Sequence, residues 1–171
     1  MNLGAAYLLR SDLGRAAEHL ASSGALFEQA AAEDYLPELE RHRAELFLRS
    51  GDLAAARAAC ARSIELAARS EARAEVGMTR RLLGLILARA GDLAGAWAEL
   101  EQAVSILHEA GNRHETARAQ IVLADIAPFL DRRADGQQAL DVAMPALHDI
   151  GARRDLAEAA AVAARHGYVT G

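Results

Sequence analysis

The sequence contains no lysine, because each of its 19 basic residues is arginine. A Walker A phosphate loop, the phosphate-binding lysine of a kinase and a Schiff-base lysine all need this side chain. The chain therefore lacks the residue on which several classes of phosphate and carbonyl chemistry depend.

Cysteine is almost absent too, with Cys60 as its one representative. A single cysteine excludes an internal disulfide and any zinc site built from several cysteines. The first residues lack the basic start and apolar run of a signal peptide, and no apolar stretch approaches the roughly 18 residues that span a bilayer. We therefore expect a cytoplasmic protein with no membrane partner.

Aromatic residues make up 4% of the chain, prolines number three, and valine and isoleucine are sparse. No segment alternates with a period of two, so we expect no sheet. The apolar residues are mostly alanine and leucine, which favour helices. The net charge of −5 argues against a nucleic-acid partner, which usually requires a basic face. Composition alone thus predicts an all-α protein.

What the chain does have is an internal repeat. Gly-Asp-Leu-Ala occurs at residues 51–54 and again at 91–94, and residues 11–14 form a third, looser copy 40 residues before the first. A period of this length indicates stacked units, each too small to bury its own apolar face. Such an array offers an extended surface for holding a partner.

Residues 40 apart agree in size when the chain is written in rows of that length. Two positions hold small residues throughout, and two others hold mostly large ones. The small sets are Gly4, Ala44, Gly84, Ala124 and Ala16, Ala56, Ala96, Gly136; the larger sets are Tyr7, Phe47, Leu87, Ala127 and Leu20, Cys60, Leu100, Leu140. We expect the small residues to let two helices approach closely while the large ones fill the space between them.

Each row splits into two predicted helices, most clearly at residues 73–90 and 93–110. Gly91 suits the left-handed turn that ends the first helix, and Asp92 can cap the second. So short a link makes the two helices antiparallel. Asn112 and Glu115 resemble a capping box after the next break, and Pro37 suits the first turn of another helix.

Two further prolines, Pro128 and Pro145, fall inside predicted helices of the fourth row. Each removes a backbone hydrogen bond and clashes with the preceding turn. We expect each of them to kink or end its helix and the fourth unit to be bent.

These features resemble the tetratricopeptide repeat (TPR) family. Its pattern is matched by Leu3-Gly4-x2-Tyr7 with Ala16-x3-Leu20, and by Leu83-Gly84-x2-Leu87 with Ala96-x3-Leu100. The period of 40 exceeds the usual 34, as in TPR-like segments of bacterial signalling and regulatory proteins. The resemblance implies an antiparallel helix-hairpin solenoid that forms a right-handed superhelix.

The resulting domain plan is one TPR-like domain over residues 1–171. It comprises a partial unit at 1–31, units at 33–70, 73–110 and 113–150, and a closing helix at 153–166. The short first helix leaves apolar residues poorly covered. We therefore keep two interpretations open: the chain is a piece of a longer protein, or its N-terminal edge docks onto a second copy or another protein.

In TPR proteins the first helix of each unit lines a concave groove, so the resemblance implies which residues face a partner here. They are Glu38, Arg41, Glu45, Arg49, Met78, Arg81, Leu85, Arg89, Arg118, Ile121 and Asp125. Arg41 shares its repeat position with Arg81, and Arg49 with Arg89. Four arginines along one groove could hold an acidic segment by bidentate hydrogen bonds. The alternative is that they pair with nearby glutamates in a solvated network.

The other reactive side chains do not match the spacing of a known metal or catalytic site. No two histidines have the spacing of a zinc helix, so we expect no metal and no cofactor. Cys60 lies at a packing position and is expected to be buried, and Trp97 is expected to pack in the core. The carboxylates form no marked pair. We therefore expect no enzyme.

The leading functional hypothesis is a protein–protein interaction scaffold that binds a protein or peptide, with an acidic one favoured, in its concave groove. The alternative is an oligomerisation or sensor segment of a larger bacterial transcriptional or signalling regulator, with a homodimer formed through the open N-terminal edge.

Overall fold

The computed structural model describes residues 2–169, and within them every regular element is helical. The helices are α1 (Asn2–Leu9), α2 (Leu13–Gln29), α3 (Leu36–Ser50), α4 (Leu53–Arg69), α5 (Arg73–Arg89), α6 (Leu93–Glu109), α7 (Arg113–Ile126), α8 (Arg133–Asp149) and α9 (Arg153–His166), with 3-10 turns η1 (Glu33–Tyr35) and η2 (Ala127–Leu130). The prediction of an all-α protein is confirmed. None of these described helices is both long and apolar enough to cross a membrane.

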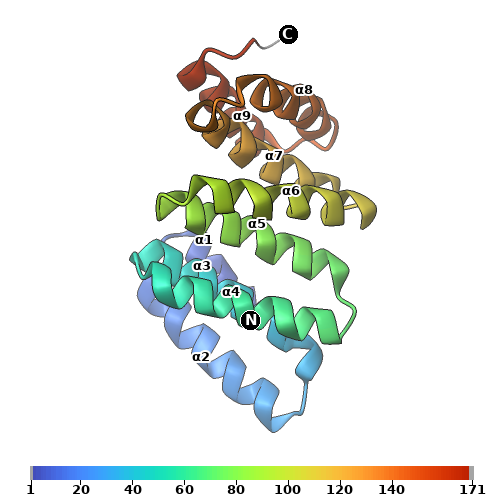
Figure 1. The fold of residues 1–171 in the computed structure, drawn as a ribbon. Coiled ribbons are helices and arrows are strands. Elements are labelled where there is room, and N and C mark those ends of the chain that lie inside the picture. Colours follow the sequence, from blue (N-terminus) through green and yellow to red (C-terminus); the bar gives the residue numbers. More distant parts are fainter. Residues whose placement is uncertain (1, 170–171) are drawn as a thin grey trace.

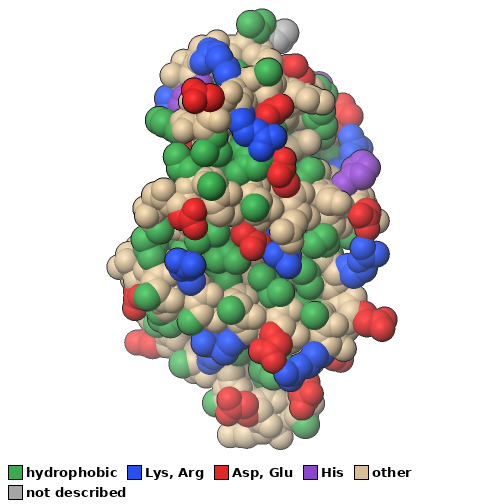
Figure 2. All heavy atoms as spheres, viewed as in Figure 1, with side chains coloured by type: hydrophobic (Ala, Val, Ile, Leu, Met, Phe, Trp, Pro, Cys, Tyr) green, Lys and Arg blue, Asp and Glu red, His purple; other side chains and the backbone are tan. Residues whose placement is uncertain are grey.

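The helices follow one another along the molecule in chain order, from α2 at one end to α8 and α9 at the other (Figure 1). Each helix packs against the next one in the sequence, and alternate helices α1, α3, α5, α7 and α9 also touch in succession. Because the connections are only a few residues long, consecutive helices run antiparallel. Charges of both signs are scattered over the face seen in Figure 2, and hydrophobic side chains gather in bands between its helices.

A left-handed residue recurs every 20 positions, at half the period seen in the sequence. These residues, all with positive φ, are Ser11, Ala31, Gly51, Glu71, Gly91, Gly111, Asp131 and Gly151. Each lies in the short connection between two helices and turns the chain back, as a left-handed residue does at a helix end. One helix with its turn therefore occupies 20 residues, so positions 40 apart lie at equivalent places on alternate helices.

Side-chain caps start four of the helices. Asp12, Asp52 and Asp92 each accept a hydrogen bond from the backbone N–H three residues on, at 3.2, 2.9 and 2.9 Å. Asn112 does the same from the N–H of Glu115 at 3.2 Å. The other half of the predicted capping box is wrong, because the Glu115 carboxylate binds arginines instead.

Three of the four positions predicted to pack closely are buried in every row, with alanine, leucine and cysteine at most 1% exposed and the glycines buried as well. At the fourth position Leu87 is 6% exposed and Ala127 is buried, but Tyr7 and Phe47 are only half-buried. A Cβ atom on Gly84 would lie 2.6 Å from Leu100 Cγ, which shows how closely α5 and α6 approach. The burial of Cys60 and Trp97 is confirmed too, at 0% and 6% exposed.

The prolines act differently from one another. Pro37 lies in the first turn of α3, as predicted. Helix α7 ends at Ile126, two residues before Pro128, which lies in the first turn of η2. Helix α8 does not end at Pro145 but continues through it to Asp149, so of the two expected outcomes a kink there stays a prediction. A bend of this unit stays a prediction.

The segment after α9 folds back onto α7 and α8. Gly167 ends α9 in a left-handed conformation, and the Tyr168 hydroxyl donates to the Ala124 carbonyl at 2.9 Å. The Gln137 side chain binds both backbone polar groups of Val169 at 2.8 Å. Gly136 is required here, because a Cβ at this position would collide with the Tyr168 hydroxyl.

Candidate functional site

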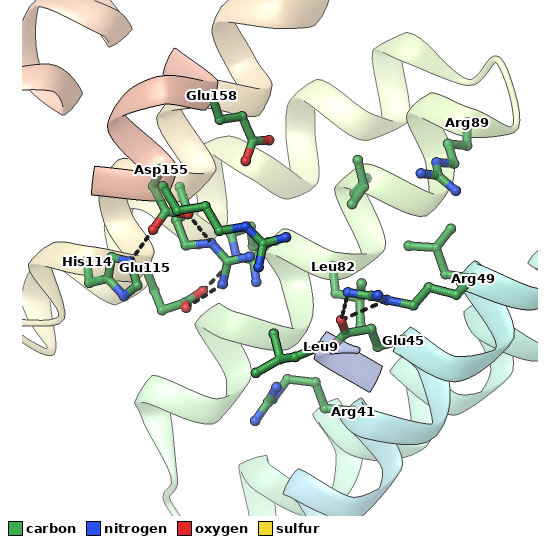
Figure 3. A pocket seen from close by; sticks show the side chains of 15 residues that line it. Leu9, Arg41, Glu45, Arg49, Leu82, Arg89, His114, Glu115, Asp155 and Glu158 are labelled. Atoms are coloured by element: carbon green, nitrogen blue, oxygen red, sulfur yellow. Dashed lines mark hydrogen bonds and ion pairs between the residues drawn. The ribbon is translucent and has the colours of Figure 1, made fainter. Parts of the chain in front are cut away.

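The candidate site is a hollow with a cavity volume of about 480 Å³. All of its lining residues come from α1, α3, α5, α7 and α9, and none comes from the described even-numbered helices. We call it the arginine groove, after Arg41, Arg49, Arg81, Arg89, Arg118 and Arg154, which line it (Figure 3). Because the helices alternate in direction and position, residues 40 apart reach this one face.

Two of the arginines join successive odd-numbered helices. Arg41 Nε on α3 donates to Glu75 Oε1 on α5 at 2.5 Å, and Arg81 Nε on α5 donates to Glu115 Oε2 on α7 at 2.7 Å. All four side chains are at most 15% exposed. These arginines therefore join neighbouring helices through buried ion pairs. They do pair with glutamates, as the alternative interpretation expected, but the pairs are buried rather than solvated.

The third repeat of this contact lacks its arginine. The equivalent position on α7 is Ile121, which is only 3% exposed. His114 Nε2 and Arg118 Nε contact Asp155 of α9 instead, at 2.8 and 3.4 Å. Arg118 also donates to Glu115 at 2.8 Å, so α7 and α9 are joined through a branched set of charges.

The surroundings shift the pKa values of the two glutamates in opposite directions. Burial raises the pKa of Glu75 above its usual range, and the single neighbouring charge of Arg41 does not offset it. Burial acts in the same sense on Glu115, but Arg81 and Arg118 together outweigh it and hold its pKa low. Burial lowers the pKa of the Arg81 guanidinium.

The remaining arginines are more available to a ligand. Arg49 donates to Glu45 at 2.8 Å and to the Leu8 carbonyl at 2.7 Å. Arg89 and Arg154 are exposed and make no hydrogen bond or ion pair with any residue of the described chain. Their charges are therefore uncompensated by direct contacts.

An apolar floor lies between the charged parts of the groove. It is made of Leu48, Leu82 and Leu85, with Leu9 of α1 facing it. In Figure 3, Leu9 and Leu82 lie between Arg49 and Arg89 on one side and the His114–Glu115–Asp155 contacts on the other. Leu9 is 65% exposed, which is high for a leucine that borders a hollow.

Seven of the eleven predicted partner-binding residues line this groove: Arg41, Glu45, Arg49, Arg81, Leu85, Arg89 and Arg118. Their role in binding a partner stays a prediction. The other four lie elsewhere, since Ile121 is buried and Met78 packs against a core cluster. Glu38 contacts His42 and Arg41, and Asp125 accepts hydrogen bonds from Arg165 and His166.

Sequence reasoning missed Leu9, His114, Arg154 and Glu158, all of which line the groove. Leu9 shares its repeat position with Arg49 and Arg89, and Glu158 shares its own with Glu38, Met78 and Arg118, so the 40-residue comparison could have found both. His114 and Arg154 lie in the first turns of α7 and α9. They share a repeat position with Asp34 and Ala74, where no groove residue was predicted, so only the packing of the helices brings them to the groove.

Other reactive side chains do not gather into a chemical site. Burial raises the pKa of the Cys60 thiol to about 12, so the thiolate is scarce at neutral pH. The Arg132 guanidinium stacks over the Trp97 ring at 4.0 Å. Within residues 2–169, no group of three or more His, Cys, Asp or Glu side chains is placed to hold a metal ion.

Comparison of the chain with protein-family models and with curated proteins finds no match.

Proposed function

We propose that this chain is a protein–protein interaction scaffold that binds a peptide or protein segment in the arginine groove, and that its helices form a solenoid of the TPR kind. One observation carries the proposal: all five odd-numbered helices contribute to a single hollow, and the even-numbered helices contribute to none of it. A surface assembled from alternate helices is long and continuous, which suits a chain segment as its ligand.

The charge of the groove supports the same proposal. Six arginines line it against four carboxylates, whereas the whole chain has a net charge of −5. A positive hollow on a negative protein concentrates acidic ligands locally and repels them elsewhere. The partner is therefore a protein or peptide with an acidic segment.

The test reverses the charge of Arg89 and Arg154, the two groove arginines whose side chains have no partner in the described chain. Arg89→Glu with Arg154→Glu leaves the buried contacts of Arg41 and Arg81 intact. Arg57→Glu with Arg153→Glu is the matched control, because both residues are exposed, lie outside the groove lining and give the same change in net charge. Circular dichroism checks that both variants keep their helices.

Affinity capture from cells of the source organism, followed by mass spectrometry, then compares the three proteins. We expect partners that the wild type and the control retain and the groove variant loses. An identical set of partners on all three proteins would refute the assignment of the groove.

A second candidate function, self-association within a larger regulator, is favoured by apolar side chains at the N-terminal end. Leu3, Leu9, Leu26 and Tyr35 are 53–65% exposed there. Single exposed leucines are ordinary, but several at one end are typical of an interaction surface. Light scattering across a range of concentrations tests it: a dimer that Leu3→Glu and Leu26→Glu dissociate supports this function, and a monomer at all concentrations refutes it.

A further inference from the structure

We propose that the segment bound by the arginine groove carries an apolar side chain flanked on both sides by acidic residues. This inference rests on the proposed function, because it describes the ligand of the same groove. It specifies an order of chemical groups along the partner, acidic, then apolar, then acidic, which the overall charge of the groove does not.

The two ends of the groove are basic. Arg49 and Arg89 extend from the C-terminal ends of α3 and α5, on one side of the hollow in Figure 3. Arg118 and Arg154 come from α7 and from the first turn of α9, the helices that carry His114, Glu115 and Asp155 on the other side. Each end thus combines one arginine without a partner, Arg89 or Arg154, with one that has carboxylate neighbours.

Arg89 and Arg154 can bind a ligand without opening the helix stack, and Arg49 and Arg118 can do so only with N–H donors that their present contacts leave unused. Arg41 and Arg81 cannot, because their buried contacts with Glu75 and Glu115 join neighbouring helices. Arg89 and Arg154 give up no contact when they bind a carboxylate. The Arg49 side chain is 30% exposed, and its Nη2 can turn from Glu45 towards a ligand while Nη1 keeps the Leu8 carbonyl. A guanidinium offers five donors, so it can hold two carboxylates at once.

The centre of the groove requires an apolar group. A charged ligand side chain placed over Leu48, Leu82 and Leu85 would lose water without gaining a partner. Leu9 faces this floor and is 65% exposed, so an apolar ligand side chain against it would remove from water mainly Leu9 and the half-buried Leu85. The same argument disfavours a uniformly acidic segment, whose middle would meet leucines.

The carboxylates of the groove limit which ligands it can bind. Glu45 lies beside Arg49, and Glu158 lies one turn after Arg154 on α9. A ligand with basic residues at its ends would meet the arginines and be repelled. Each of these carboxylates offsets part of the positive charge at its own end, so each end favours one or two acids over a long acidic run.

The experiment selects from a phage library of random 12-residue peptides on immobilised wild-type protein. Binders are then counter-screened on the Arg89→Glu/Arg154→Glu variant and on the Arg57→Glu/Arg153→Glu control. We expect enrichment of peptides with acids on both sides of a Leu, Ile, Met or Phe, lost on the groove variant alone. Synthetic peptides with this pattern should bind at least tenfold more tightly, by fluorescence anisotropy, than versions with the apolar residue changed to Ser or with all acids moved to one end.

The possible results separate the two proposals. Peptides that need the groove arginines but lack the acidic–apolar–acidic order would overturn this inference and leave the groove as the binding surface. Binders that are retained equally on all three proteins, or no enriched binders, would overturn both. A Leu82→Ser variant gives a further check, since it should weaken the selected peptides while leaving their dependence on salt unchanged.

Discussion

Helix pairs α3–α4 and α5–α6 follow the same 40-residue plan with different residues, and the differences show what the plan conserves. Where its two helices approach, the α3–α4 pair has Ala44 opposite Cys60, and the α5–α6 pair has Gly84 opposite Leu100. All four residues are buried. Neither residue type is repeated, but in both pairs a small residue on the first helix faces a larger one on the second.

The same two pairs differ in their buried charges. The contact from α3 has one arginine for one glutamate, Arg41 with Glu75, whereas Glu115 lies between Arg81 on α5 and Arg118 on α7. The pKa of Glu75 is raised and that of Glu115 is lowered. At Glu75 one cation does not offset burial and the neighbouring carboxylates Glu38 and Glu115, whereas at Glu115 two cations outweigh burial.

The largest effect should come from removing Glu115. Glu115→Gln leaves Arg81 and Arg118 close together without their shared anion, which should cost about 3 kcal/mol at pH 7. Glu75→Gln should cost about 1 kcal/mol, because burial already disfavours the ionised form there. Urea unfolding followed by circular dichroism measures both. Equal losses for the two variants would contradict the comparison.

These glutamates should also give opposite pH dependences. The pKa of Glu115 is lowered on folding, so its contribution is present above the unfolded value of about 4.3 and is lost as the pH falls through its folded pKa. The pKa of Glu75 is raised, so its contribution is full below the unfolded value and declines as the pH rises through the folded pKa. Unfolding at pH 3–7 should therefore show a loss in acid that Glu115→Gln removes and Glu75→Gln does not.

The next effect tests the shared space between helices. Gly84→Ala copies Ala44 into the second pair, and the new Cβ, 2.6 Å from Leu100 Cγ, should cost about 2 kcal/mol. Adding Leu100→Cys copies Cys60 as well, and the double variant should be at least about 1 kcal/mol more stable than the sum of the single effects. Gly14→Ala is the control, since its Cβ has room and alanine favours a helix. Additive losses would refute the compensation.

A smaller gain should follow from replacing His42 with the residue that α5 has at the same place, Leu82. His42 is 8% exposed and its Nδ1 has no hydrogen-bond partner. His42→Leu should stabilise the protein by about 1 kcal/mol at pH 7.5. Burial, and then the charge of Arg41, lower the pKa of His42 below 6.5. The wild type should therefore lose stability as the pH falls below the unfolded value, and the variant should lose less.

Urea unfolding at pH 7.5 and pH 5.5 measures this difference. His108→Gln is the control, because His108 is exposed and should not alter the pH dependence. A loss of stability in His42→Leu at both pH values would show that the imidazole supports the fold.

The smallest effect concerns the turns that follow α4 and α6. Glu71 has φ of +56° and its counterpart Gly111 has +70°. A left-handed conformation costs about 1 kcal/mol for a residue with a side chain, so Glu71→Gly should stabilise the protein by about 0.5–1 kcal/mol. Gly111→Glu should have the opposite sign. Thermal unfolding measures both, and a shared sign would contradict this account.

The fold class and the helix ends at glycines could be predicted because both depend on local patterns. Gly91 and Gly111 mark turns by their conformational freedom, and alanine-rich stretches between them favour helices. The 20-residue spacing could not be seen, because Ala31 and Glu71 hold left-handed positions with residues that rarely adopt them. Tertiary structure imposes those conformations.

The groove could be predicted only where the repeat carries it. Arg41 and Arg81 share a position, so their common face followed from the period. Their partners Glu75 and Glu115 lie 34 residues further on, a distance that the packing angle of the helices sets and no local pattern reveals. Leu9 holds the repeat position of Arg49 and Arg89, so the period also places it on this face.

The spacing of the left-handed residues also determines which changes in chain length the protein can absorb. Loss or gain of 40 residues at the turns would return every later side chain to its former face, with a shorter or longer groove. A change of 20 would exchange the roles of odd and even helices, so that arginines beyond that point would leave the hollow. A single residue inserted within a helix would rotate the side chains beyond it by about 100°, which would separate the two basic ends of the groove.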